Sequence, residues 1–214
     1  ESGMAGGDDA KRFATEIHKS SQRLLTLIND IIKISELDAT SSDEAFENVN
    51  LYEIAKSTVQ MLELSAQKNG VIMNLSGKDI SIMADRQMID ELIYNLCDNA
   101  IRYNNPGGRV WVSVYEREAE AYADGGGSGV NNGTYGNSSK RAVVIEVKDN
   151  GIGISKENQQ RIFERFYRVD KSRSKLTGLG LAIVKHIVAK HDNAHIELDS
   201  ELGTGTTIRV VFEQ

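Results

Sequence analysis

Cysteine, proline and tryptophan each occur once among the 214 residues of this chain. Because a disulfide needs two thiols, Cys97 cannot form one within the chain, and a lone cysteine favours a reducing compartment. The sequence also lacks an apolar run of the roughly 18 residues that a membrane-spanning helix needs, and no secretory signal peptide opens it. These absences exclude an intramolecular disulfide framework and give no sign of a transmembrane helix within these residues.

Basic residues are few relative to acidic ones. Lysine and arginine total 25 against 31 aspartates and glutamates, so the formal net charge is -6. Nonspecific nucleic-acid binding relies on a basic surface, so this composition argues against a nucleic-acid partner. It leaves a nucleotide site open, because phosphates are held locally by backbone amides and a few cations.

Residues 8–38 read as one long helix with a broad apolar stripe. Two series of residues are spaced by seven, and three further residues widen the stripe: Phe13, Ser20, Leu27 and Ile34; Ile17, Leu24 and Ile31; and Leu25, Ile28 and Ile32. A stripe this broad is typical of a multi-helix bundle rather than of a two-stranded coil. Since one helix cannot bury it alone, we expect the helix to pair with another chain.

The rest of the chain mixes helix and strand after a polar linker at residues 39–47. Apolar periodicity predicts helices over 51–68, 85–103, 155–166 and 179–191, and strands over 71–75, 80–83, 109–116, 143–148, 196–200 and 206–212. Residues 117–141 are rich in Gly, Asn and Ser, a composition that cannot offset its ordering entropy by apolar burial. We interpret them as a disordered insertion at a hairpin tip. They carry no lysine at P-loop spacing and no following helix start.

Asn95, Asn99 and Arg102 form the first pattern with chemical content. Their spacing of i, i+4 and i+7 places them on one face of a helix. Two amides and a guanidinium there suit a metal-bound polyphosphate, although a solvated polar stripe explains the same spacing. Taken alone, the pattern leaves both interpretations open.

Asp149-Asn150-Gly151-Ile152-Gly153-Ile154 follows a predicted strand and is the second pattern. An aspartate there can accept a hydrogen bond from an exocyclic amine such as that of adenine. The glycines allow a ligand to approach the backbone closely. An ordinary Asn-Gly turn is the alternative explanation.

Two more patterns complete the series. In residues 162–170, Phe163 and Phe166 at i and i+3 indicate core packing, while Arg168 or Lys171 is placed to reach phosphates from a mobile lid. Thr177-Gly178-Leu179-Gly180-Leu181 opens a helix, so its backbone N–H groups and positive dipole end can face a phosphate.

In this order and spacing, the four patterns resemble the asparagine box, first glycine box, phenylalanine box and second glycine box of sensor histidine kinases. The resemblance covers nearly the whole chain. It implies an α/β (α+β) fold: a two-layer sandwich with a mixed sheet, of the GHKL (Bergerat) type, preceded by a long bundle helix. Residues 1–38 then correspond to part of the dimerisation and phosphoacceptor hairpin, mainly its second helix, and 48–214 to the ATP-binding catalytic domain.

The resemblance also implies the cofactors ATP and Mg²⁺ and a role for each matching residue. Asn99 is expected to coordinate Mg²⁺ with Asn95 assisting, Arg102 and Arg168 to contact phosphates, and Asp149 to bind the adenine amine. The full set expected to bind ATP is Asn95, Asn99, Arg102, Tyr103, Asp149, Gly151, Gly153, Ile154, Tyr167, Arg168, Gly178, Leu179, Gly180, Leu181 and Thr207.

The family's acceptor histidine lies in a box similar to His-Glu-Leu-Arg-Thr-Pro, which this sequence lacks. Lys19-Ser20-Ser21 follows His18, and the only proline is Pro106. We therefore expect a piece of a larger, membrane-bound bacterial receptor, from its cytoplasmic region, that cannot phosphorylate itself. The segment between Asp170 and Gly178 is short for the family's lid.

The resemblance implies that the intact enzyme phosphorylates a histidine with ATP and passes the phosphoryl group to an aspartate of a response regulator receiver domain. A homodimer through the bundle helix is also implied. Three alternatives stay open: a nucleotide-binding module without kinase activity, a docking and phosphatase scaffold for the regulator, and another GHKL ATPase. The last is disfavoured by Asn95, because gyrase-like relatives carry a glutamate there as a base for water and an amide cannot take that proton.

Overall fold

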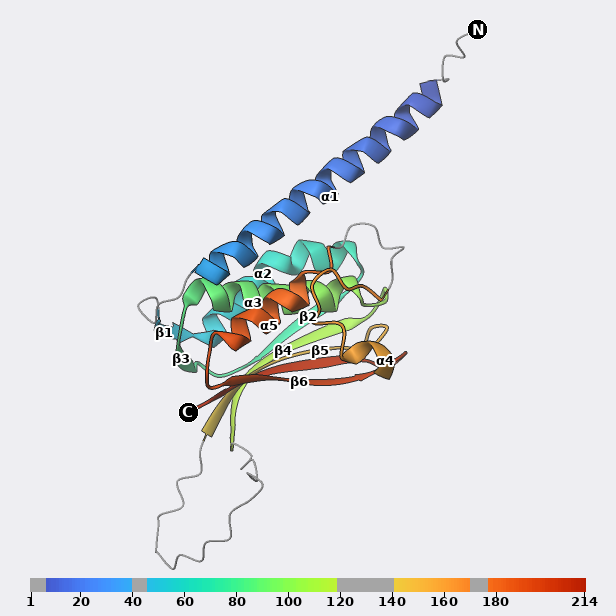
Figure 1. The fold of residues 1–214 in the computed structure, drawn as a ribbon. Coiled ribbons are helices and arrows are strands. Elements are labelled where there is room, and N and C mark those ends of the chain that lie inside the picture. Colours follow the sequence, from blue (N-terminus) through green and yellow to red (C-terminus); the bar gives the residue numbers. More distant parts are fainter. Residues whose placement is uncertain (1–6, 40–45, 119–140, 170–176) are drawn as a thin grey trace, which may run out of the picture.

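The computed structural model describes residues 7–39, 46–118, 141–169 and 177–214 (Figure 1). Our predictions for the short lid segment lie outside these ranges. So does most of the predicted insertion, except that Arg117, Glu118 and Arg141 belong to strands.

A five-stranded mixed sheet and the helices on one of its faces form the body of the protein (Figure 1). The strand order is β2-β4-β5-β7-β6, with β2 parallel to β4 and the other pairs antiparallel. This arrangement confirms the predicted two-layer α/β fold. The elements are α1 (Gly7–Ala39), β1 (Glu47–Asn50), α2 (Leu51–Lys68), β2 (Ile72–Gly77), β3 (Ser81–Ala84), α3 (Arg86–Arg102), β4 (Arg109–Glu118), β5 (Arg141–Asp149), α4 (Lys156–Gln159), α5 (Gly180–Ala189), β6 (Ala194–Glu201) and β7 (Gly205–Glu213).

The core lies between the sheet and helices α2, α3 and α5. Successive side chains of a strand point to opposite faces, so one face of each central strand carries an unbroken apolar set. In β4 and β5 this set is Val110, Val112, Val114, Val143, Ile145 and Val147, all buried against the helices. This alternation gives the Val-rich strands one continuous apolar face against which the helices pack.

Helices α2 and α3 begin at residues whose side chains cap them. The Asp85 carboxylate accepts hydrogen bonds from the backbone N–H groups of Gln87 (2.7 Å) and Met88 (3.2 Å). Asn50 caps α2 in the same way through the N–H of Glu53, at 3.0 Å. These caps set where each helix starts and so fix which residues of α3 face the sheet.

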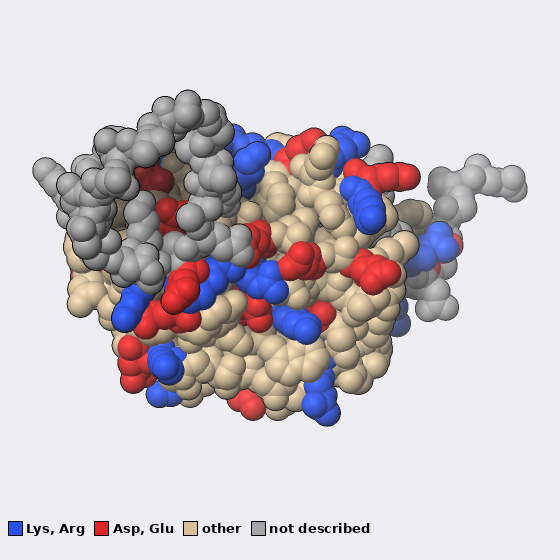
Figure 2. Space-filling model, turned by 90° about the horizontal axis from the view of Figure 1, so that it is seen from below, with Lys and Arg blue, Asp and Glu red and all other residues tan. Residues whose placement is uncertain are grey.

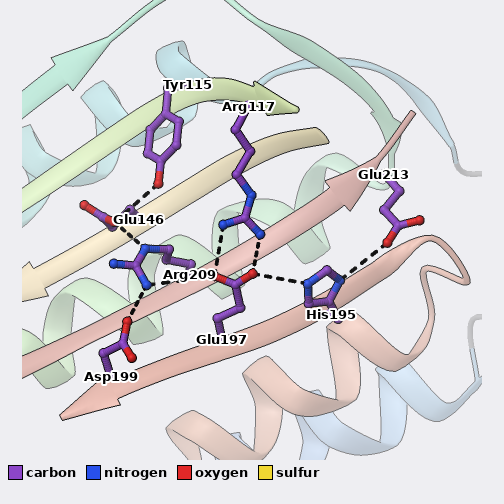
Figure 3. A network of polar contacts seen from close by, with 8 residues as sticks. All are labelled: Tyr115, Arg117, Glu146, His195, Glu197, Asp199, Arg209 and Glu213. Carbon is purple, nitrogen blue, oxygen red and sulfur yellow. Dashed lines mark hydrogen bonds and ion pairs between the residues drawn. The ribbon is translucent and has the colours of Figure 1, made fainter. Parts of the chain in front are cut away.

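The face of the sheet away from the helices carries charges of both signs (Figure 2). Arg209 bonds Glu146 (2.6 Å) and Asp199 (2.5 Å), while Arg117 forms a bidentate contact with Glu197 (Figure 3). The Arg117 guanidinium lowers the pKa of the Glu197 carboxyl below its ordinary value. Arg209 on β7 thus pairs with charges on both neighbouring strands, while the Arg117–Glu197 contact reaches from β4 to β6.

The predicted end of the linker, one predicted helix and the predicted packing of Phe166 need correction. Glu47, which we placed at the end of the linker, is instead the first residue of strand β1 (Glu47–Asn50), which pairs with β3. Strand β2 pairs with β4, so β2 and β3 belong to different sheets. The helix expected over 155–166 stops at Gln159 and continues as turns. Phe166 is not a core residue: it is 55% exposed and has a φ of 65°.

Helix α1 exposes most of its apolar stripe along the described part. Phe13, Ile17, Leu24, Leu25, Ile28, Ile31 and Ile32 are all exposed. Leu27, by contrast, packs partly against the core, where the end of α1 approaches α5. Within the described ranges, no helix has the length and apolar character needed to cross a bilayer.

Candidate functional site

A cavity of about 730 Å³ opens between α3, the start of α5 and the ends of β5 and β7. Residues 152–155, Asn158, Ile162 and residues 167–169 form a further wall, and Thr26, Asn29 and Ile32 of α1 close one side. A volume of this size is typical of a small-molecule site. The cavity is therefore the candidate site.

Helix α3 presents the three predicted polar residues to the cavity. Asn95, Asn99 and Arg102 all line it, and Tyr103 follows at the end of the helix. The Nδ2 atom of Asn95 donates to the carbonyl of Glu91 (2.7 Å) and to its carboxylate (2.9 Å). Arg102 donates through Nε to Asp98 at 2.5 Å. An acidic residue one helical turn earlier thus holds each of Asn95 and Arg102.

The N-terminus of α5 faces this polar row. Gly178, Gly180 and Leu181 line the cavity, and Leu179 precedes the helix without a side-chain cap. A Cβ on Gly180 would lie 2.9 Å from Oδ1 of Asn95 and 3.3 Å from Nδ2 of Asn99. The first N–H groups of a helix have no partner inside it, so the α5 end and the α3 amides together suit an anionic group.

Asp149 lies at the other end of the cavity, at the last position of β5. It is 9% exposed, and its Oδ1 accepts the N–H of Gly151 at 2.8 Å. Burial raises the pKa of Asp149 to about 6, against the lowering effect of hydrogen bonds from the backbone of Gly151 and Thr206. A buried carboxyl with a raised pKa next to an open cavity is a candidate binding group.

Gly153 forms the adjacent wall and is held against β6. Its φ is 64°, and a Cβ there would lie 1.9 Å from the carbonyl oxygen of Glu201. The next residue, Ile154, donates its N–H to Oγ of Ser200 at 2.9 Å and lines the cavity. This close approach of two backbones explains the second glycine of the Asp149 pattern.

Tyr167 and Arg168 line the cavity from the segment after α4. The Tyr167 hydroxyl donates to Oδ1 of Asn158 at 2.6 Å, and the Arg161 guanidinium lies 4.2 Å from the centre of the tyrosine ring. Phe166 donates its N–H to the carbonyl of Gly178 at 2.9 Å. This bond joins the two chain segments that flank residues 170–176.

Three predicted residues do not line the cavity. Gly151 packs under the end of α3, where a Cβ would lie 2.4 Å from the carbonyl oxygen of Tyr103. Leu179 is fully buried in the core. Thr207 is on the opposite face of the sheet, because Thr206 pairs with Asp149 and takes the inward position. Thr206 therefore occupies the place that we assigned to Thr207.

Sequence reasoning missed several residues that line the cavity. Glu91 and Asp98 precede two predicted ligands by four positions, a helical spacing that identifies them once the ligands are known. Asn158 lies on the short helix α4. The α1 residues Thr26, Asn29 and Ile32 carried no signal, because their place depends on how α1 docks on the body.

The cavity is thus chemically divided. One end gathers amides, a guanidinium and a helix N-terminus, which together suit a polyphosphate and an attendant cation. The other end holds a buried carboxyl for an exocyclic amine, beside the apolar side chains of Val147, Ile152 and Ile208. A nucleoside triphosphate matches both ends.

The family model described as Histidine kinase-, DNA gyrase B-, and HSP90-like ATPase matches residues 84–214. The chain is 31% identical over 205 residues to the sensor histidine kinase WalK of Bacillus subtilis, which covers 94% of this chain and 30% of that protein. It is 34% identical over 211 residues to the sensor-like histidine kinase SenX3 of Mycolicibacterium smegmatis, covering 95% and 49%. The chain therefore spans half or less of the length of these relatives.

Two solved structures share the fold. Full-length ShkA in complex with AMPPNP superposes with a TM-score of 0.69 at 22% identity, over 94% of this chain and 38% of that one. The mycobacterial sensor histidine kinase MprB gives a TM-score of 0.59 at 24% identity, over 78% of this chain and 97% of that one.

Proposed function

Because this chain belongs to the family of histidine kinase-, DNA gyrase B- and HSP90-like ATPases, we propose that it is the ATP- and Mg²⁺-binding catalytic region of a sensor histidine kinase. The relatives named above support the kinase branch of the family. One observation carries the proposal: a single cavity joins the buried carboxyl of Asp149 to the row of Asn95, Asn99 and Arg102 that faces the start of α5.

The two ends of the cavity assign a role to each group. The ionised Asp149 carboxylate accepts the exocyclic amine of adenine, while Tyr103, Gly153, Ile154 and Thr206 surround the base. Arg102 and Arg168 contact the phosphates, together with the N–H groups at Gly178, Gly180 and Leu181. Tyr167 closes the site from the α4 side.

Mg²⁺ fits the α3 row. It prefers oxygen ligands and keeps several waters, so one or two protein oxygens and the phosphates suffice. Asn95 donates two hydrogen bonds from Nδ2 to Glu91, so its Oδ1 points away from Glu91. Asn99 lies one helical turn further along and offers a second amide. When bound, the ion neutralises phosphate charge, while Asn95 and Asn99 hold the position of that charge.

The proposed reaction of the whole protein transfers the γ-phosphoryl group of ATP to a histidine ring nitrogen, which leaves ADP, and then to a receiver-domain aspartate. Such transfer needs positioning and charge neutralisation more than covalent chemistry. The acceptor box is not among these residues. The exposed stripe of α1 supports a homodimer in which a second helical chain covers it. A membrane-bound receptor with this region in the cytoplasm is also part of the proposal.

Another ATPase of the same superfamily is the second candidate. It is disfavoured because a residue that must activate water needs a basic oxygen, and Asn95 offers a neutral amide. A binding module without kinase activity fits the same cavity. The acceptor of the phosphoryl group distinguishes the three candidates: water for an ATPase, histidine for a kinase, and none for a binding module.

Binding of the ATP analogue AMPPNP with Mg²⁺ is the direct test of the proposal. We expect the unmodified chain to bind it in calorimetry, and Asn99→Ala to weaken the affinity about tenfold through loss of a metal contact. Asn193→Ala is a matched control outside the cavity, where Nδ2 of Asn193 donates to the carbonyl of Glu213. Absence of heat with the unmodified chain would refute the assignment.

Incubation of this chain alone with γ-labelled ATP is expected to leave no acid-labile phosphate on it, because the acceptor box is missing. Acid-treated gels and intact mass measure this. His18, the one histidine on α1, is the site to inspect. Label at His18 would show that the acceptor is present after all.

A further inference from the structure

Glu91 places a carboxylate inside the cavity that none of the four sequence patterns uses. It lies on α3, one helical turn before Asn95, and is half-buried. A negative charge beside a polyphosphate is electrostatically unfavourable, so its presence there calls for a compensating role.

The contacts of Asn95 indicate that role. Two hydrogen bonds run from its Nδ2 atom to Glu91, one to the main-chain carbonyl at 2.7 Å and one to Oε1 at 2.9 Å. The amide has two N–H donors on that nitrogen, so Glu91 takes up both. A bond to a charged acceptor is stronger than one to a neutral acceptor, and the carboxylate therefore fixes the amide plane.

The opposite end of the same amide meets the start of α5. Oδ1 of Asn95 lies so close to Gly180 that a Cβ there would be 2.9 Å away. The oxygen thus points into the space between α3 and α5, next to Asn99. If the Asn95 carboxamide were flipped so that Oδ1 and Nδ2 changed places, its N–H groups would face this space. An N–H group cannot ligate a cation.

We propose that Glu91 is a positioning residue, which holds the carboxamide of Asn95 with its oxygen toward the site of the nucleotide-bound divalent cation. This inference rests on the proposed function and adds that Glu91 supports the cation-dependent part of nucleotide binding only. Glu91 itself touches neither phosphate nor metal in this assignment.

The test compares Glu91→Met with the unmodified chain. Methionine keeps the length of the side chain and favours helix, but removes the carboxylate acceptor and leaves only the main-chain carbonyl for the Asn95 amide. The first measurement is the ratio of AMPPNP affinities with Mg²⁺ and with a chelator. We expect this ratio to fall about tenfold, as is usual when the partner of a metal ligand is removed, while the affinity in chelator stays nearly unchanged or rises.

The second measurement needs no nucleotide. In the ¹⁵N-labelled chain, the side-chain NH₂ signals of Asn95 are identified by their loss in Asn95→Ala. We expect Glu91→Met to shift them and to speed their exchange with water. Glu91→Gln keeps an oxygen acceptor and is expected to restore most of the Mg²⁺ ratio. Glu63→Met, on the exposed face of α2, is the control for a Glu-to-Met change in a helix.

Failure of the role of Glu91 and failure of the proposed function would give different results. If the unmodified chain does not bind AMPPNP, the proposed function fails and the inference with it. If it binds, but Glu91→Met changes the Mg²⁺ ratio by less than about twofold or leaves the Asn95 signals in place, only the inference is overturned. A melting temperature close to that of the unmodified chain shows that the variant is folded.

Discussion

Asp149→Asn is expected to remove most of the ATP affinity while raising the melting temperature of the nucleotide-free chain. An amide is a weaker acceptor than a carboxylate, and its N–H group opposes the amine of adenine. Loss of a hydrogen bond to a charged group costs about 1.5–3 kcal/mol, which corresponds to roughly 10- to 100-fold in affinity.

The stability gain follows from the pKa of Asp149. In the folded chain this pKa is raised from 3.8 to about 6 by burial. Its favourable contribution to stability is therefore fully present below pH 3.8 and is lost as the pH rises through about 6. At pH 7.5 the carboxyl is ionised and buried, and a neutral asparagine avoids that cost, which amounts to at most ~3 kcal/mol.

Thermal unfolding at pH 7.5 and calorimetry across pH 5–8 measure both effects. ATP affinity of the unmodified chain should weaken as the pH falls through about 6, because protonated Asp149 is a weaker, uncharged acceptor and carries an O–H donor. In Asp149→Asn this dependence should disappear. Asp192→Asn, an exposed position outside the cavity, should change neither quantity. An Asp149→Asn variant that melts lower and still binds ATP tightly would contradict the role of this carboxyl.

Gly153→Ala is expected to destabilise the whole domain. The added Cβ would lie 1.9 Å from the backbone carbonyl oxygen of Glu201, and a φ of 64° is unfavourable for alanine. Overpacking against backbone and left-handed strain together cost about 3 kcal/mol or more, enough to lower the melting temperature by roughly 10 °C. Binding should weaken as well, since Gly153 lines the cavity.

Gly203→Ala separates the two causes. Gly203 also has a positive φ, of 86°, but a Cβ added there would meet no heavy atom within 4 Å. Only the backbone strain of about 1–2 kcal/mol remains at this position. The free energies of unfolding of the two variants, measured in urea, should therefore differ by the cost of the clash between the new methyl group and Glu201. Equal losses would show that β6 yields to the new methyl group.

Local patterns in the sequence predicted most of the body. The helix over 51–68 begins and ends where we placed it, because its apolar spacing coincides with a cap at Asn50. Asp85 indicated the start of α3 in the same way. Once α3 is in place, helical geometry alone puts Asn95, Asn99 and Arg102 on one wall of the cavity.

The remaining errors come from contacts between distant residues. Strand β1 (Glu47–Asn50) is polar and becomes a strand only because it pairs with β3, far along the chain. Thr206 and Thr207 have the same chemistry, and only the register against Asp149 decides which one points inward. Phe166 reads as an apolar core residue, whereas its backbone bond to Gly178 turns it outward.

The antiparallel strands β4 and β5 run from the nucleotide cavity to the far end of the sheet. Val110 is opposite Asp149 at the nucleotide end, and Glu118 is opposite Arg141 at the other. The eight steps from Val110 to Glu118 along β4 span about 27 Å. A chromophore attached at the Glu118–Arg141 end would therefore stand clear of the cavity, yet within the range of energy transfer to a fluorescent nucleotide. The hairpin offers a built-in attachment point for an optical reporter of ATP occupancy.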